Sequence, residues 1–196
     1  MPMPKQTARE KVIQASQQLM VAQGYTATTV DEIVEAAGVA KGSFYHAFKS
    51  KEELALAALD DYFQHGMTII AGGAYVDEQD PVKKVFAFLD HVNDKACELW
   101  EHGCLLGSMS IELADNYPNL IARIDCLFEE MERRIRAILE PALKAKGVKT
   151  PSALELARHL IAVLEGSIIM SRSHRDVKNL HAGISHYRRY LDGLLG

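Results

Sequence analysis

The hydrophobic and polar positions in the first third of the chain predict a series of short helices. Serine or threonine is followed three residues later by glutamate at Thr7, Thr29 and Ser50, which is the capping-box pattern that marks a helix start. Gly24 and Gly38 follow the first two apolar runs and predict where those helices end. After Thr7, the apolar positions that share one helical face are Val12, Ala15, Leu19 and Met20.

The stretch Gly38–Phe48, GVAKGSFYHAF, predicts a third short helix. Its Phe44 and Phe48 are four residues apart, so both side chains face inward. The outer face then carries Lys41, Gly42, Ser43, Tyr45 and His46. A turn at AAGV joins this helix to the preceding one, and a longer helix follows Ser50. The arrangement predicts a helix-turn-helix.

Helical periods continue beyond a break at 72–81. We expect further helices near 82–101, 104–114, from Pro118, from Pro151 and near 177–195. Pro141 is expected to bend or end the long helix from Pro118, because proline has no backbone N–H. Pro151 is expected in the first turn of its helix, where a missing N–H costs nothing.

The helix from Pro151 is apolar on more than one face, so it must be buried on more than one side, and a partner subunit is a natural cover. No strand pattern stands out. The predicted fold class is therefore all-α. We predict a helix-turn-helix domain at 1–52 and a second helical domain at 53–196.

Composition places the chain among ordinary globular proteins, with 48% hydrophobic and 24% charged residues. The N-terminal MPMPKQTAREK lacks the apolar core of a secretory signal, and no apolar run approaches a membrane span. Three cysteines without C-x-x-C spacing favour a reducing cytoplasm over disulfides or zinc. The net charge of −4 counts against a nucleic-acid binder that uses its whole surface, so any such role needs a local patch.

The outer face of the third predicted helix carries groups suited to the DNA major groove. Lysine donates to guanine O6 and N7, and serine serves either base type. Tyrosine and lysine hold phosphates, and a residue without a side chain, Gly42, lets the backbone approach closely. Backbone N–H groups at Thr28, Thr29, Ser50 and Lys51 suit phosphate oxygens. Alternatively, Thr29 and Ser50 are only caps, and Lys41, Lys49 and Lys51 form a solvated face.

The segment Thr28–Leu59, TTVDEIVEAAGVAKGSFYHAFKSKEELALAAL, resembles the DNA-binding domain of the TetR family of bacterial transcriptional repressors. The resemblance implies an all-helical homodimer that binds a palindromic operator. It also implies that 1–52 is the DNA-binding domain and that 53–196 is a ligand-binding and dimerisation domain, whose small-molecule effector releases DNA. By position, it implies groove contacts from Lys41, Gly42, Ser43 and His46 and phosphate contacts from Thr29, Tyr45 and Lys51. The helices near 118–145 and 151–173 match the family's usual dimer interface.

Cys104, in EHGCLLGSMSIELA, is expected in the first turn of a helix, where free N–H groups and the helix dipole favour a thiolate. The segment is similar to one in a TetR subgroup that includes electrophile-responsive repressors. Ile169 stands where one such repressor has a lysine partner for the cysteine. The alternative is a small buried structural thiol.

Methionine and aromatic side chains adapt to varied apolar ligands. The candidates to line an effector pocket are Met67, Phe86, Trp100, Met109, Met131 and Met170, although each also fits a plain core. The histidines show no metal-binding spacing, and we expect no metal or cofactor.

Two other functions compete with a regulator. An enzyme has little support, because no catalytic motif is present and nothing in the sequence positions Glu112 and Asp115, the nearest candidates. A helical dimer that binds small molecules without binding an operator is the second, and the intact Lys41–Lys51 surface argues against it.

Overall fold

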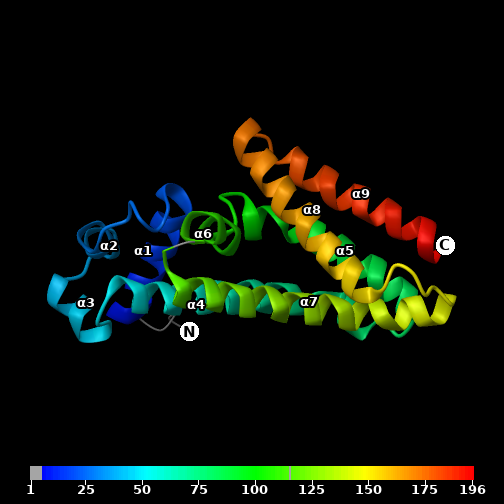
Figure 1. The fold of residues 1–196 in the computed structure, drawn as a ribbon, viewed down its shortest axis with the longest axis horizontal. Helices are drawn as coiled ribbons and strands as arrows, with labels where there is room; N and C mark the ends of the chain where they lie inside the picture. Colours follow the sequence, from blue (N-terminus) through cyan, green and yellow to red (C-terminus); the bar gives the residue numbers. More distant parts are fainter. Residues whose placement is uncertain (1–5, 115) are drawn as a thin grey trace, which may run out of the picture. The chain divides into compact units, whose positions relative to one another are not determined.

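The computed structural model describes residues 6–114 and 116–196 and contains nine α-helices, one short 3₁₀ helix and no strand in this part of the chain (Figure 1). The all-α prediction is confirmed. The elements are α1 (Ala8–Gln23), α2 (Val30–Ala37), α3 (Lys41–Ala47), α4 (Lys51–Ala71), η1 (Ala74–Asp77), α5 (Pro81–Trp100), α6 (Leu105–Leu113), α7 (Pro118–Lys146), α8 (Ala153–His174) and α9 (Lys178–Leu195).

The helices form two compact units. The first contains the described residues of Met1–His65 together with Cys104–Asp125, and the second contains Gly66–Gly103 and Cys126–Gly196. Both α4 and α7 therefore have residues in each unit. The predicted domain boundary between residues 52 and 53 stays a prediction.

Side chains cap the N-termini of the first helices as the sequence predicts. At α1 and α2, the hydroxyls of Thr7 and Thr29 accept the backbone N–H three residues on, and Glu10 and Glu32 accept the cap N–H in return. Gly38 ends α2 in the left-handed conformation, with φ 62°. At α4 the Ser50 hydroxyl accepts the N–H of Glu53 as predicted. The return bond differs, because the Glu53 carboxylate accepts the N–H of Lys49 instead of that of Ser50.

In the first unit, α1 packs against both α2 and α3. Phe44 and Phe48 are buried as predicted, and their ring centroids are 5.9 Å apart. These two anchors hold α3 against the unit and leave its opposite side toward solvent.

Of the two outcomes expected at Pro141, an end of the long helix is wrong, because α7 continues through the proline to Lys146, and a bend stays a prediction. Leu139, Ala142 and Leu143 on either side of the proline are buried. Their packing supports the last turns despite the lost hydrogen bond.

The start predicted for the next helix is also wrong. Ser152 caps α8, its hydroxyl accepts the N–H of Glu155 and the Glu155 carboxylate accepts the N–H of Ser152. Pro151 thus lies before the cap, and α8 begins at Ala153. This capping box was visible in the sequence and is a more specific start signal than a proline.

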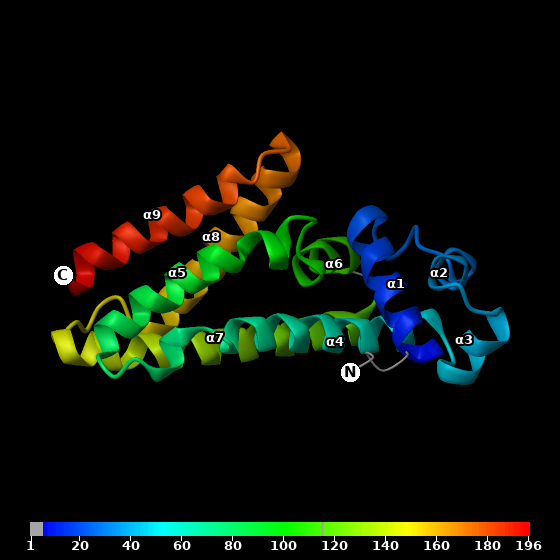
Figure 2. The same ribbon diagram turned by 180° about the vertical axis from the view of Figure 1, so that it is seen from behind.

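In the second unit, α8 and α9 lie side by side and antiparallel (Figures 1 and 2). The α9 backbone lies against α8 side chains at Gly183, where a Cβ atom would overlap the Ser167 hydroxyl. The buried Tyr187 hydroxyl of α9 donates to the carbonyl of Leu156 at 2.8 Å. Within one chain α9 covers one side of α8, while Ile169 and Met170 of α8 remain exposed.

Candidate DNA-binding surface and effector cavity

The outward side of α3, which we call the α3 face, consists of Lys41, Gly42, Tyr45 and His46, all exposed, and the half-buried Ser43. Tyr45 is 57% exposed, and its ring rests edge-on against Phe44, with centroids 5.1 Å apart. The buried Phe44 therefore orients Tyr45 while its hydroxyl stays accessible.

No described atom of the protein occupies the space beside Gly42. A Cβ atom at this position would meet no described atom within 4 Å. Its φ is not in the left-handed region, so neither packing nor backbone conformation requires glycine here.

Lys41 is paired with Asp31 of α2 across the turn, with Nζ 2.6 Å from the carboxylate. The hydrogen bond to Asp31 and its negative charge raise the pKa of Lys41. Both side chains are exposed, so the pair can be exchanged for another partner at little cost.

The two threonines before α2 have internal roles. The Thr28 side chain is fully buried, and its hydroxyl donates to the carbonyl of Gly24 at 2.6 Å. The Thr28 backbone N–H donates to the carbonyl of Tyr25 at 3.2 Å, and the phosphate contact expected from this N–H stays a prediction. The Thr29 hydroxyl is exposed but bonded to Glu32 as a cap.

Lys51 also serves the protein's own backbone. Its ammonium donates to the carbonyls of Tyr25, Thr26 and Thr28 at 2.9, 3.4 and 2.8 Å. It lies 4.3 Å from the centre of the Tyr25 ring, and burial lowers its pKa. These bonds let Lys51 hold the turn before α2, and the phosphate contact expected from Lys51 stays a prediction. Lys49 remains exposed.

Glu112 of α6 meets the same turn from the other side. Its carboxylate accepts the N–H groups of Tyr25 and Thr26 at 2.8 and 2.7 Å. Burial raises the pKa of Glu112, but the hydrogen bonds from Thr26 and Tyr25 and the charge of Lys51 outweigh it, and the pKa is lowered. Glu112, weighed above for catalysis, therefore has a structural position, whereas Asp115 lies outside the described residues.

Sequence reasoning missed one cation beside the α3 face. The Arg9 guanidinium of α1 lies 5.2 Å from the centre of the Phe48 ring, at the end of α3. The position of Arg9 in the first turn of α1 gave no signal, because only folding brings that turn against the end of α3.

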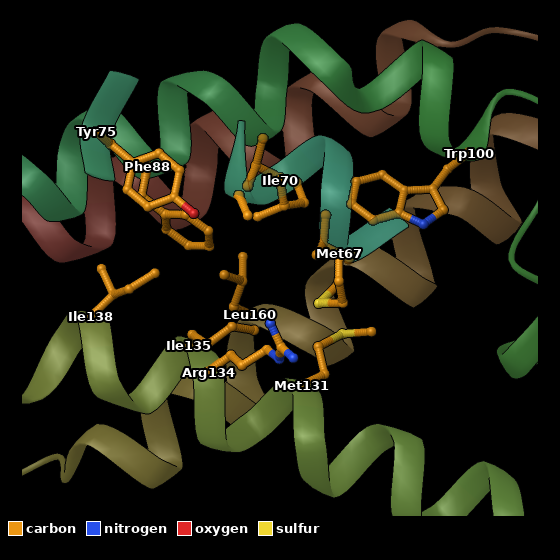
Figure 3. A pocket seen from close by; sticks show the side chains of 13 residues that line it. Met67, Ile70, Tyr75, Phe88, Trp100, Met131, Arg134, Ile135, Ile138 and Leu160 are labelled. Atoms are coloured by element: carbon orange, nitrogen blue, oxygen red, sulfur yellow. The ribbon is translucent and has the colours of Figure 1, made fainter. Parts of the chain in front are cut away.

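The second unit contains a mainly apolar cavity of about 120 Å³ (Figure 3). It lies between α4, η1, α5, α7 and α8. Its lining side chains are Met67, Ile70, Ala71, Tyr75, Phe88, Val92, Trp100, Met131, Arg134, Ile135, Ile138, Leu160 and Leu164.

Of the predicted lining residues, Met67, Trp100 and Met131 lie in this cavity. The other three do not. Phe86 instead packs under the guanidinium of Arg188, Met109 is buried in the first unit, and Met170 is exposed on α8. The sequence identified suitable residue types, but which face of each helix points toward the cavity depends on how the helices pack.

Cys104 is the N-cap of α6, and its Sγ accepts the N–H of Gly107 at 3.5 Å. The prediction placed it in the first turn, one position further on. The side chain is only 4% exposed, while Cys126 is exposed and Cys97 is half-buried. Burial and the cap bond suit a structural thiol.

Within the described residues, no three histidine, cysteine, aspartate or glutamate side chains lie close enough to hold a metal ion. No described helix combines the length and hydrophobicity needed to cross a bilayer.

The helix-turn-helix with an exposed α3 face, joined to further helices that enclose a cavity, defines a class of DNA-binding regulators. The profile for bacterial regulatory proteins of the tetR family matches residues 12–58. A profile for the C-terminal domain of LmrA/YxaF-like transcriptional regulators matches residues 81–186. The chain belongs to the TetR family and is a DNA-binding transcription regulator, not an enzyme.

Similar proteins support this assignment along most of the chain. An HTH-type transcriptional regulator in the lacX 3′ region of Lactococcus lactis is 26% identical over 175 residues, 89% of this chain and 88% of that protein. The repressor NemR of Escherichia coli K12 is 24% identical over 193 residues and 93% of each chain. A TetR regulator from Chloroflexus aurantiacus has a TM-score of 0.81 and 28% identity, with 94% of each chain covered.

Proposed function

We propose that this regulator is a cytoplasmic repressor. It binds a palindromic operator as a homodimer through its α3 face and leaves the DNA when a small, mainly apolar effector occupies the cavity. The observation that carries the proposal is the α3 face itself. Two buried phenylalanines anchor the helix, and its polar side chains point outward with a glycine that the fold does not need.

The roles on this face follow from side-chain chemistry. Lys41, once released from Asp31, and Ser43 donate to base edges, and His46 lies near the bases. Tyr45 and Lys49 contact phosphates and set the register. Thr29 joins them at the start of α2. Arg9 is an additional phosphate contact that the fold brings beside α3.

Homodimerisation is supported by the family, whose regulators bind operator DNA and act as dimers with small-molecule effectors. The helix pair proposed here is α8 with α9, in place of the pair 118–145 and 151–173. Exposed apolar side chains lie on α8 and α9: Ile169, Met170 and Tyr190. The exposed side of α7 is charged instead, with Glu129, Arg133, Arg136 and Glu140. Apolar surface has the larger free energy to gain from a partner.

The cavity supports a noncovalent effector. Its walls are mostly apolar and include Trp100 and two methionines, which adapt to varied ligands. The helices α4 and α7 continue from the unit with the cavity to the unit with α3, so they provide covalent routes by which effector binding could move α3. Burial of Cys104 gives the electrophile hypothesis less support than the cavity gives this one.

Fluorescence polarisation with DNA from upstream of the protein's own gene tests operator binding. The Lys41→Ala and Tyr45→Ala variants should each bind about tenfold or more weakly, because a base or phosphate contact is lost. Lys178→Ala, at the exposed start of α9, is the matched control and should bind like the wild type. Wild-type affinity of both α3 variants would contradict the assignment of this face. Failure of the wild type to bind any such DNA would favour the rival small-molecule-binding dimer.

A further inference from the structure

The size and walls of the cavity limit its ligand to a compact apolar body. Its volume of about 120 Å³ is similar to that of an engineered apolar cavity of about 150 Å³ that binds benzene. The rings of Phe88 and Trp100 and the thioethers of Met67 and Met131 face it (Figure 3). Such walls suit one aromatic ring or a short branched chain.

Arg134 is the charged residue among the described side chains that line the cavity. Figure 3 shows its side chain reaching from α7 into the space between the apolar walls. Its Nε donates to Glu130 at 2.6 Å. A guanidinium has five N–H donors, and in the described part of the chain no further hydrogen bond of Arg134 occurs. The donors of its outer edge are therefore available to a ligand.

Tyr75 provides a second donor from the opposite wall. Its side chain is buried, and its ring is held edge-on by Phe88 at 5.3 Å between centroids. Burial raises the pKa of Tyr75, against a smaller opposite effect from the charge of Arg134, so the phenol stays protonated and can donate. Among the described residues its hydroxyl has no hydrogen-bond partner.

The Tyr75 hydroxyl and the outer edge of Arg134 therefore face an otherwise apolar space, and among the described residues neither has an acceptor there. A neutral apolar ligand would displace water from the part of Arg134 that faces the cavity and return no partner, a cost that the 48% exposure of this side chain reduces but does not remove. A cationic ligand would be repelled by it. A carboxylate accepts two N–H bonds from one guanidinium in bidentate geometry and can accept the tyrosine hydroxyl as well.

We propose that the effector is a small apolar monocarboxylate, most simply an aromatic ring with a short acidic chain. Its carboxylate is held by Arg134 and Tyr75, and its ring lies against Phe88 and Trp100. This inference deepens the proposed function, because it takes the cavity as the effector site.

The test is direct binding to the full-length protein without DNA. Trp100 is the single tryptophan of the chain and lines the cavity, so its fluorescence reports occupancy. The probes are 3-phenylpropionate, its neutral amide 3-phenylpropionamide and the cation 3-phenylpropylamine. We expect the acid to bind at least about tenfold more tightly than the amide, and the amine to bind most weakly.

Two neighbouring arginines offer a matched pair of variants, since Arg133 and Arg134 both pair with Glu130 but only Arg134 lines the cavity. Arg134→Gln should weaken the acid about tenfold to a hundredfold and leave the amide nearly unchanged. Arg133→Gln should bind all three probes like the wild type. Tyr75→Phe should weaken the acid by a few fold. Circular dichroism checks that each variant is folded.

Several outcomes would overturn the inference. These are equal affinity for acid and amide, equal losses in Arg133→Gln and Arg134→Gln, or no binding of any probe at millimolar concentration. The two proposals fail separately. Selective acid binding to a protein that binds no operator would refute only the proposed function. Operator binding together with indifference to the carboxylate would refute only the ligand class.

Discussion

Gly42 shows at the scale of one residue how a position can serve a partner at the expense of the free protein. Glycine in a helix costs about 0.5–1 kcal/mol relative to alanine, and nothing in the described structure occupies the space beside it. The proposed close approach of the α3 backbone to DNA would explain why that cost is tolerated.

The Gly42→Ala variant should therefore be slightly more stable than the wild type and bind operator more weakly. The gain should be about 0.5 kcal/mol, or one to two degrees in Tm, measured by thermal unfolding, with operator affinity measured by polarisation. Gly193→Ala in α9 is the control, because a Cβ atom there also meets no described atom. Operator affinity equal to that of the wild type in Gly42→Ala would refute the close approach.

Individual residues divide into those that the sequence already places and those that only contacts explain. The anchors Phe44 and Phe48 follow from their spacing, as does the outward position of Lys41, Tyr45 and His46. The positions of Thr28 and Lys51 do not. Both belong to the segment that resembles the family, yet the Thr28 hydroxyl and the Lys51 ammonium donate to backbone carbonyls of this chain. These bonds depend on how the turn before α2 folds.

At the scale of elements, the connection between α6 and the turn before α2 has the clearest chemical basis. Glu112 holds two N–H groups of that turn, and Lys51 holds its carbonyls. One negative and one positive side chain thus bind the N–H groups and the carbonyls of the same backbone segment, and we call this pair of contacts the clamp. In the same segment, burial together with the charges of Tyr117, Glu52 and Glu112 raises the pKa of Tyr25 to about 12. The turn sets the start of α2, so the clamp helps to position the helix-turn-helix.

Removing the charge in Glu112→Gln should lower the free energy of unfolding at pH 7 by about 1 kcal/mol, below the usual range for hydrogen bonds to charged groups because Glu112 is exposed. The folded-state pKa of Glu112 lies below its ordinary value of 4.5. Its contribution is therefore present above pH 4.5 and is lost as the pH falls through the folded-state pKa.

Urea unfolding of wild type and Glu112→Gln from pH 7 down to pH 3 measures this difference. The two stabilities should converge as the pH falls below 4.5. Glu129→Gln, an exposed glutamate of α7, is the control and should follow the wild type throughout. A gap between Glu112→Gln and wild type that stays constant down to pH 3 would show that the carboxylate charge is not responsible.

At the scale of the whole molecule, the apolar side chains left exposed on α8 and α9 predict a dimer. Sedimentation at micromolar concentration should give a dimer for the wild type and a monomer for Ile169→Glu, because a charge would be buried without a partner. Ile169 is 54% exposed and Ile111 of α6 is 74% exposed, so Ile111→Glu is the control and should remain dimeric. A monomeric wild type would contradict the proposed interface.

The sequence by itself determined the helices, their caps and the helix-turn-helix, because these depend on residues within a few positions of one another. It also indicated the family through one continuous segment. Tertiary structure decided the rest. Folding brings Glu112 and Lys51 to one turn, although they are 87 and 26 residues away from Tyr25 in the chain. Packing around Pro141 lets α7 continue past the proline. Packing also decides that Met67, Trp100 and Met131 line the cavity, whereas Phe86, Met109 and Met170 do not. It also placed Arg134 and Tyr75 on facing walls of the cavity. Those outcomes depend on which distant side chains pack together, and the local pattern does not contain that information.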